Sequence, residues 1–256
     1  MRAALALQWA TFARSTTAPI ATLLIVLIPP LVGLGMVALV RSDVPLGPSV
    51  AKFEPYLEGP FGEAVAGLAG QIIAVVALIA GGFAVAWLFG REWADRSIGA
   101  LFSLPTSRLA IAGAKLLVIG VWLAACVTAA MLLTVAGVAV VAPEGLTSAA
   151  VDVFLRDWVA GLSMGALALP FAWMAVRFRG YLGAAAAIIA VTAISQVLAT
   201  LGLGAWVPYV APVLWVGAGG AEAAAGVGAV QLVWALAFAA AGVWLSARAF
   251  TRVLID

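Results

Sequence analysis

The densest group of charged side chains in this apolar sequence lies at residues 90–108. At 100° per residue, a helix through this passage would gather its polar and small residues within one arc of about 140°. The opposite side would carry apolar residues, so such a helix would lie along a membrane surface. The mixed charge of the polar face suits docking to a protein, whereas a simple topology anchor needs only basic residues. The residues on this face are Arg91, Glu92, Asp95, Arg96, Gly99 and Ser103.

The end of this passage contains further helix signals. Glu92 and Arg96 stand four residues apart with the acid first, which is the favourable order for a pair on one helix. Pro105 stops the helix, and Thr106 or Ser107 can cap a new helix that begins near Arg108. Lys115 lies two turns further on the same face as Arg108, from where its side chain could extend to the membrane surface.

Enzymatic chemistry has little support in the sequence. The chain has no histidine and a single cysteine, Cys126, inside an apolar run, so we expect no metal site, no histidine acid–base chemistry and no disulfide within the chain. Neither lysine, Lys52 or Lys115, belongs to a phosphate-binding glycine-rich loop. If the chain drives transport, its energy must come from a partner. The net charge of +2 is too small to indicate nucleic acid as a partner.

The composition places these residues in a membrane. Of the 256 residues, 66% are hydrophobic and only 9% are charged, and a membrane span needs about 20 mostly apolar residues. The fold class is therefore an all-α membrane protein that spans the lipid bilayer and forms one transmembrane domain. Its six predicted spans are residues 19–40, 64–89, 108–140, 150–176, 180–203 and 228–250.

Charge asymmetry predicts that both termini are cytoplasmic, because cytoplasmic loops are enriched in basic residues. The outer side would then hold only Arg41, Lys52 and Arg156. The apolar segment 204–227, with its prolines and aromatics, is predicted to be a re-entrant external segment of short helices before the sixth span. The cytoplasmic side would hold ten basic residues, Arg2, Arg14, Arg91, Arg96, Arg108, Lys115, Arg177, Arg179, Arg248 and Arg252.

Three smaller expectations concern the connections. Residues 1–15 can form an amphipathic interfacial helix with Leu5, Trp9 and Phe12 on one face, or simply extend the first span. The pair Pro29-Pro30 should kink or break that span, because proline removes a backbone donor. The proline-rich loop 41–63 should be irregular and solvated.

Polar residues inside the spans have two interpretations. They can line a substrate pathway, or they can bond to a neighbouring helix, which is worth about 0.6 to 2 kcal/mol in lipid. At the outer end of the fourth span, Asp152 and Arg156 can pair on one face, and with Asp157 they form either a solvated helix end or an exit-side substrate contact. The candidate pathway residues are Gln71, Thr128, Ser195, Gln196 and Gln231.

The passage after the second span resembles that of the ABC-2 type transporter permeases. The resemblance rests on an acid at the end of that span, a short amphipathic helix, a Leu-Pro-x-Ser-Arg sequence and a lysine seven residues later. The layout of the spans also resembles that of this family, over nearly the whole chain. The matching residues are Glu92, Leu104, Pro105, Ser107, Arg108 and Lys115.

The resemblance implies a mechanism and partners, and it implies that the permease has no catalytic residue of its own. Two permease copies, identical or related, would sit on two separate ATPase subunits, which would bind ATP and Mg²⁺. The helix after the second span would be the coupling helix, with Arg91, Glu92, Asp95, Arg96, Ser103 and Arg108 as the ATPase contacts. The small size is similar to that of exporters of drugs, antibiotics or peptides in bacterial plasma membranes.

Two alternatives stay open at this point. A secondary transporter would need inverted repeats or charges inside the membrane, and the sequence displays neither. A non-transporting anchor or immunity protein that sequesters a peptide is compatible with the sequence.

Overall fold

The computed structural model describes residues 2–42 and 59–253, and within them it contains helices and no strand. Six helical stretches are long and apolar enough to cross a membrane, which confirms the six predicted spans. They are α2, α3, α5, α6 continued by α7, α8 and α11. The helices are α1 (Arg2–Ala13), α2 (Thr17–Val40), α3 (Phe61–Ala94), α4 (Ile98–Phe102), α5 (Arg108–Val141), α6 (Ser148–Ala168), α7 (Phe171–Arg177), α8 (Leu182–Thr200), α9 (Ala211–Trp215), α10 (Gly220–Ala225) and α11 (Ala229–Arg252).

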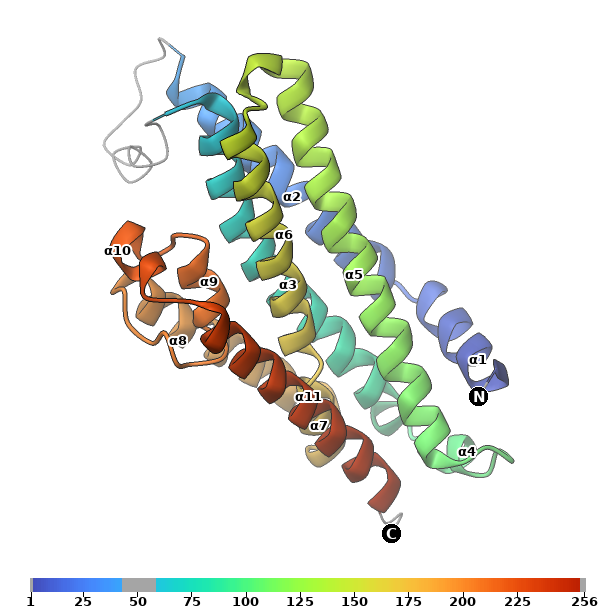
Figure 1. Cartoon of the computed structure of the whole chain (residues 1–256). Coiled ribbons are helices and arrows are strands. Elements are labelled where there is room, and N and C mark those ends of the chain that lie inside the picture. The colour runs from blue at the N-terminus through green and yellow to red at the C-terminus, as the bar shows by residue number, and fades with distance from the viewer. Residues whose placement is uncertain (1, 43–58, 254–256) are drawn as a thin grey trace.

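The bundle has two distinct ends. Both chain termini and α4 lie at the lower end in Figure 1, and the turn between α5 and α6 lies at the upper end. An even number of spans requires this arrangement of the termini. The predicted loop 41–63 falls mostly on residues outside the described part of the chain.

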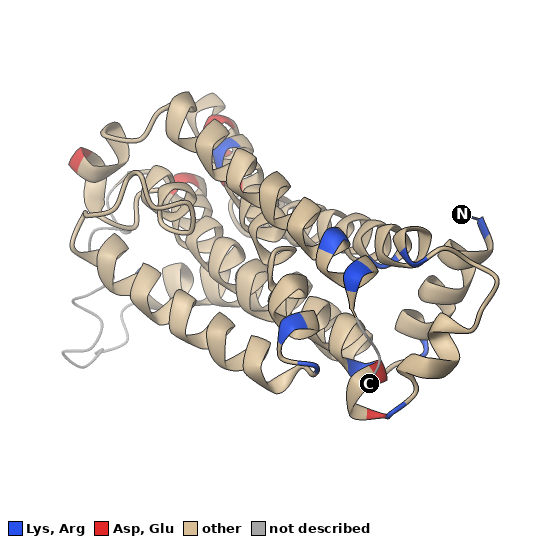
Figure 2. Ribbon diagram, turned by 90° about the horizontal axis from the view of Figure 1, so that it is seen from below, with Lys and Arg blue, Asp and Glu red and all other residues tan. Residues whose placement is uncertain are grey.

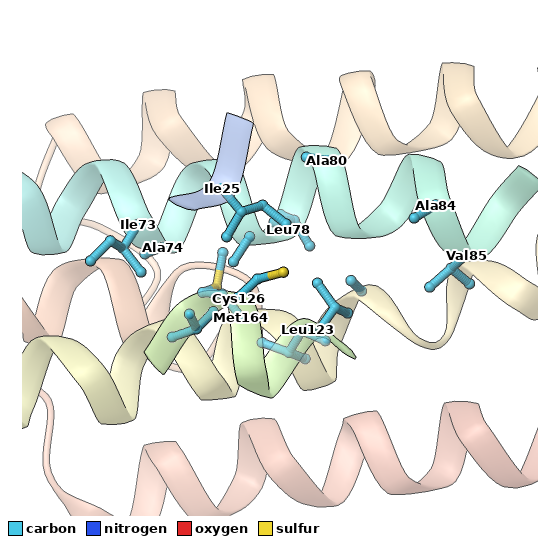
Figure 3. Packing of buried hydrophobic residues seen from close by; sticks show 14 of the residues in the cluster. Ile25, Ile73, Ala74, Leu78, Ala80, Ala84, Val85, Leu123, Cys126 and Met164 are labelled. Atoms are coloured by element: carbon cyan, nitrogen blue, oxygen red, sulfur yellow. The ribbon is translucent and has the colours of Figure 1, made fainter. Parts of the chain in front are cut away.

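Helix α3 is the centre of the bundle and packs against α2, α5, α6, α7 and α8. Its buried residues are mainly small or branched apolar residues, so neighbouring backbones approach closely. Figure 3 shows Ile73 and Leu78 of α3 beside Ile25 of α2, Cys126 of α5 and Met164 of α6. Packing of small residues is the usual way in which helices associate in lipid, where the hydrophobic effect between helices is absent.

Prolines interrupt the spans at a different place from the predicted one. Helix α2 continues through Pro29 and Pro30, so of the two predicted outcomes, a kink or a break, the break is wrong. The predicted span 150–176 is instead divided at Leu169–Pro170, where α6 ends and α7 begins. Pro170 packs on Gly242 of α11, where an added Cβ would lie 2.5 Å from the proline Cγ.

The N-terminal segment forms a helix of its own. Helix α1 ends at Ala13, and the Ser15 hydroxyl accepts a hydrogen bond from the Ala18 backbone N–H at the start of α2. The buried residues of α1 are spaced by four, at Ala4, Gln8 and Phe12. Of the predicted apolar face, Phe12 is buried against the bundle, whereas Trp9 is 51% exposed.

The segment before the last span forms short helices, as the sequence predicted. Helix α9 packs against α6 and α11, and α10 follows it. The ring of Tyr209 lies between those of Phe171 and Phe238, with centroids 5.9 and 5.7 Å away. Burial raises the pKa of Tyr209, so its phenol stays neutral.

A hydrogen bond between α2 and α5 offers a test of the packing. The Trp122 Nε1–H donates to Thr22 Oγ1 at 2.9 Å. We expect Thr22→Val to lower the free energy of unfolding by about 0.6 to 1.7 kcal/mol, the range for hydrogen bonds between membrane helices. The matched control is Thr200→Val, whose hydroxyl bonds only to Gln196 of its own helix. Unfolding in mixed micelles measures both variants, and equal stabilities would contradict the expectation.

Candidate functional site

The polar passage folds differently from the single helix that its periodicity predicted. Helix α3 continues to Ala94, so Arg91 and Glu92 belong to the end of the second span. The chain then turns at Arg96, whose φ of 54° is left-handed. The Ser97 N–H donates to the Glu92 carbonyl and the Arg96 N–H to that of Trp93, which is the bonding pattern of a Schellman cap. The cap ends α3 and leaves α4 only five residues long.

This break divides the predicted mixed-charge face. Asp95, Arg96 and Ser103 are exposed, as a docking surface requires. Arg91 is half-buried, with its guanidinium 4.8 Å from the centroid of the Trp87 ring. Glu92 is buried, so the prediction that it lies on the exposed face is wrong.

Glu92 instead forms an ion pair with Lys115 of α5. The Lys115 ammonium lies 2.6 Å from Glu92 Oε1 and donates to the Leu88 carbonyl at 2.5 Å. The Lys115 side chain is completely buried, so the expectation that it reaches the membrane surface is wrong. The physical reason is that the carboxylate and the carbonyl supply its partners between the helices, where an unpaired charge would be very costly.

Aromatic rings surround this ion pair and join it to α11. The ammonium is 5.4 Å from the centroid of Phe89 and 5.7 Å from that of Phe250. Phe250 meets Phe89 and Phe102 edge to face, at 5.8 and 5.3 Å between centroids. Cation–π attraction and edge-to-face contacts are both favourable here.

Arg108 completes the cluster from the other side of α4. Its guanidinium lies 4.1 Å from the centroid of Phe102 and donates to the Val253 carbonyl at 2.8 Å. The Ser107 hydroxyl accepts a hydrogen bond from the Ala110 N–H, so the predicted cap of the third span is confirmed at this residue. We name the whole cluster the α4 junction: Phe89, Glu92, Phe102, Arg108, Lys115 and Phe250.

The α4 junction links a short exposed helix to three spans. Phe102 belongs to α4, Glu92 to α3, Lys115 and Arg108 to α5, and Phe250 to α11. Contacts between these side chains therefore connect α4 with α3, α5 and α11. Figure 2 views this end of the bundle and shows most of the basic segments around the two termini and the turn that holds α4.

The candidate pathway residues do not form one group. Thr128 of α5 accepts a hydrogen bond from Trp158 Nε1 of α6, at 3.0 Å, beside an apolar cavity of about 310 Å³. The Gln231 side chain accepts from the Gly228 N–H and caps the start of α11. The Thr128 contact joins two helices, as the packing interpretation expects, whereas Gln231 bonds only near the start of its own helix in the described part of the chain.

The other three pathway candidates lie on α3 and α8. Gln71 is half-buried on α3, Ser195 is buried on α8, and Gln196 is half-buried beside it. Helix α8 packs against α3 and α7. The structure therefore distributes the five residues over α3, α5, α8 and α11.

The polar cluster of the fourth span is also divided. Asp152 and Arg156 are exposed, and the Arg156 guanidinium lies 5.7 Å from the centroid of the Trp215 ring of α9. Asp157 is completely buried, which the sequence analysis missed. Its spacing from Ala150, Phe154 and Gly161 puts it on the buried face of α6, and this periodicity could have revealed it.

A family model described as ABC-2 family transporter protein matches residues 12–196, which is more than half of the chain. A search of curated proteins gave no match. ABC-2 permeases are membrane components that associate with ABC ATPase subunits and are not themselves catalytic. With its six apolar spans and this match, the chain belongs to the ABC-2 family of transporter proteins.

Proposed function

We propose that this protein is the permease subunit of an ATP-binding-cassette exporter and that α4 is its coupling helix. Two permease copies form the substrate pathway, and two ATPase subunits bind ATP and Mg²⁺. The exported substrate is a drug, an antibiotic or a peptide. The protein lies in a bacterial plasma membrane with both termini in the cytoplasm, which is consistent with the basic residues around α4.

The α4 junction is the observation that carries this proposal. A coupling helix must be reachable by the ATPase and mechanically joined to the spans that it moves. Asp95, Arg96 and Ser103 are exposed beside α4, and Phe102 and Arg108 join it to α11 and α5. Glu92, which the sequence analysis placed in the ATPase contact, is assigned instead to the transmission of movement between α3 and α5.

The decisive experiment reverses the exposed charges of the turn before α4. We expect Asp95→Lys with Arg96→Glu to abolish stimulation of ATP turnover when the permease is reconstituted with its ABC ATPase subunits. Like charges placed opposite each other across an interface cost several kcal/mol, whereas both residues are exposed and the fold should be retained. ATP turnover and transport into proteoliposomes are the measurements.

The matched control is Asp152→Lys, an exposed charge change at the far end of the bundle, which should leave ATP turnover unchanged. Normal turnover in the double reversal would show that coupling through α4 is wrong. Transport that survives ATP depletion but collapses with the proton gradient would favour a secondary transporter. Resistance that persists without any ATPase would favour a non-transporting immunity or anchor protein.

A further inference from the structure

Asp157 is a buried acid in a membrane span. Helix α6 starts at Ser148, and nine residues at 1.5 Å each place Asp157 about 14 Å along it. The side chain is 0% exposed. Neither carboxyl oxygen has a hydrogen-bond partner in the described part of the chain. The α4 junction does not use this residue.

The carboxyl group packs directly against the backbone of α3. A Cβ added to Gly70 would lie 2.1 Å from Asp157 Cγ and 2.4 Å from each of its oxygens. The carboxyl group therefore fills the space that this glycine leaves open. One turn further along α6, Gly161 lies against the apolar side chains of Ile73 and Val127.

Among the described residues, the opposite charge that acts on this acid is that of Arg156, and its effect is smaller than the cost of burial. Arg156 is exposed and lies against Trp215, and Asp152 is exposed on the same helix. Helices α3, α5, α9 and α11 pack against α6. Helix α9 has no titratable side chain, and Cys126 lies in the middle of α5. The other titratable side chains of these helices lie near helix ends: Glu63, Arg91 and Glu92 on α3, Arg108 and Lys115 on α5, and Arg248 and Arg252 on α11.

These surroundings determine what the carboxyl group can bind. An ionised carboxylate without a partner is strongly disfavoured in such an environment. A metal ion would need several oxygen ligands, and no group of three metal-binding side chains occurs among the described residues. A proton neutralises the carboxylate and needs no additional space.

We propose that Asp157 is a proton-binding site. The carboxyl group holds its proton while α3 and α6 are packed together. When transport opens this interface to water, an Asp157 oxygen releases the proton to a water molecule, and the proton returns when the helices close. The exchange during transport rests on the proposed function, whereas the bound proton at rest does not.

Infrared spectroscopy of the reconstituted full-length permease tests the resting state at neutral pH. We expect a C=O stretching band of a protonated carboxylic acid, and we expect Asp157→Asn to remove it. Asparagine has nearly the shape of the protonated acid, so the fold should persist, and Asp157→Ser provides a second variant. The control Asp152→Asn should keep the band. A band that survives in both Asp157 variants, or its absence in the wild type, would overturn the proposal.

The second measurement follows hydrogen–deuterium exchange at this band in the complex with the ATPase subunits. We expect turnover of ATP to accelerate the exchange several-fold over the resting rate. Unchanged exchange in a complex that transports would overturn the release step. In the uncoupled double reversal of Asp95 and Arg96, the resting band should remain and exchange should stay slow. The resting band and its exchange rate therefore distinguish a failure of coupling through α4 from a failure of the proposed proton-binding site.

Discussion

Replacing Lys115 with methionine is expected to lower the free energy of unfolding by about 3 to 5 kcal/mol, the usual cost of breaking a buried ion pair. Methionine preserves much of the volume of the lysine stem but leaves the Glu92 carboxylate buried and unpaired. The Leu88 carbonyl loses a donor as well. Reversible unfolding in mixed micelles, followed by tryptophan fluorescence, measures the loss.

The double variant Glu92→Met with Lys115→Met separates charge from packing. Replacing both members of a buried ion pair with apolar residues is often neutral or stabilising, so most of the lost stability should return. ATP-driven transport should not return with it if the polar link between α3 and α5 transmits movement. A single variant as stable as the wild type would mean that the ion pair has no structural role.

Gly90→Ala is expected to destabilise the protein by about 1 to 3 kcal/mol, the usual cost of overpacking. The added Cβ would lie 2.5 Å from the Tyr181 nitrogen and 2.6 Å from the Gly180 carbonyl carbon. Both atoms belong to the backbone between α7 and α8, so no side chain can rotate away. The helix end that carries Glu92 would have to shift, and ATP turnover should fall with it.

Gly67→Ala is the matched control on the same helix, because nothing lies within 4 Å of the Cβ that it adds. Alanine also has a higher helix propensity than glycine, by about 1 kcal/mol. We therefore expect this variant to be at least as stable as the wild type. Equal unfolding midpoints for the two alanine variants would show that α3 and the α7–α8 turn are not in close contact.

Apolar length alone was sufficient to predict the six spans, because membrane thickness sets a strict lower limit on each helix. It could not predict the break at Leu169–Pro170 or the continuity through Pro29 and Pro30. Whether a proline breaks a span depends on neighbouring helices that can satisfy the freed carbonyls. Such neighbours are a property of the tertiary structure.

The local structure of the polar passage could not be predicted from its periodicity. A helical wheel assumes one continuous helix, and Arg96 in the left-handed region ends that helix. The wheel therefore paired Glu92 with Arg96, although its partner is Lys115. The topology contains a clue to this pair: α3 and α5 run in opposite directions, Glu92 is near the end of α3, and Lys115 is near the start of α5. A search for opposite charges at the same distance from the end of the bundle could therefore have found this pair.

The unequal lengths of the spans have a consequence for how the bundle fits a bilayer. Helices α3 and α5 have 34 residues each and α8 has 19, which at 1.5 Å per residue gives about 51 Å and about 28 Å. A bilayer is about 40 to 45 Å thick with its headgroups, and its hydrocarbon core is about 30 Å. The long pair can incline or extend beyond the headgroups, whereas α8, which packs on α3, is only about as long as the hydrocarbon core is thick. In Figure 1 α9 and α10 lie beyond the end of α8. The segment 204–227, which contains α9 and α10, therefore extends the bundle on the side where α8 ends.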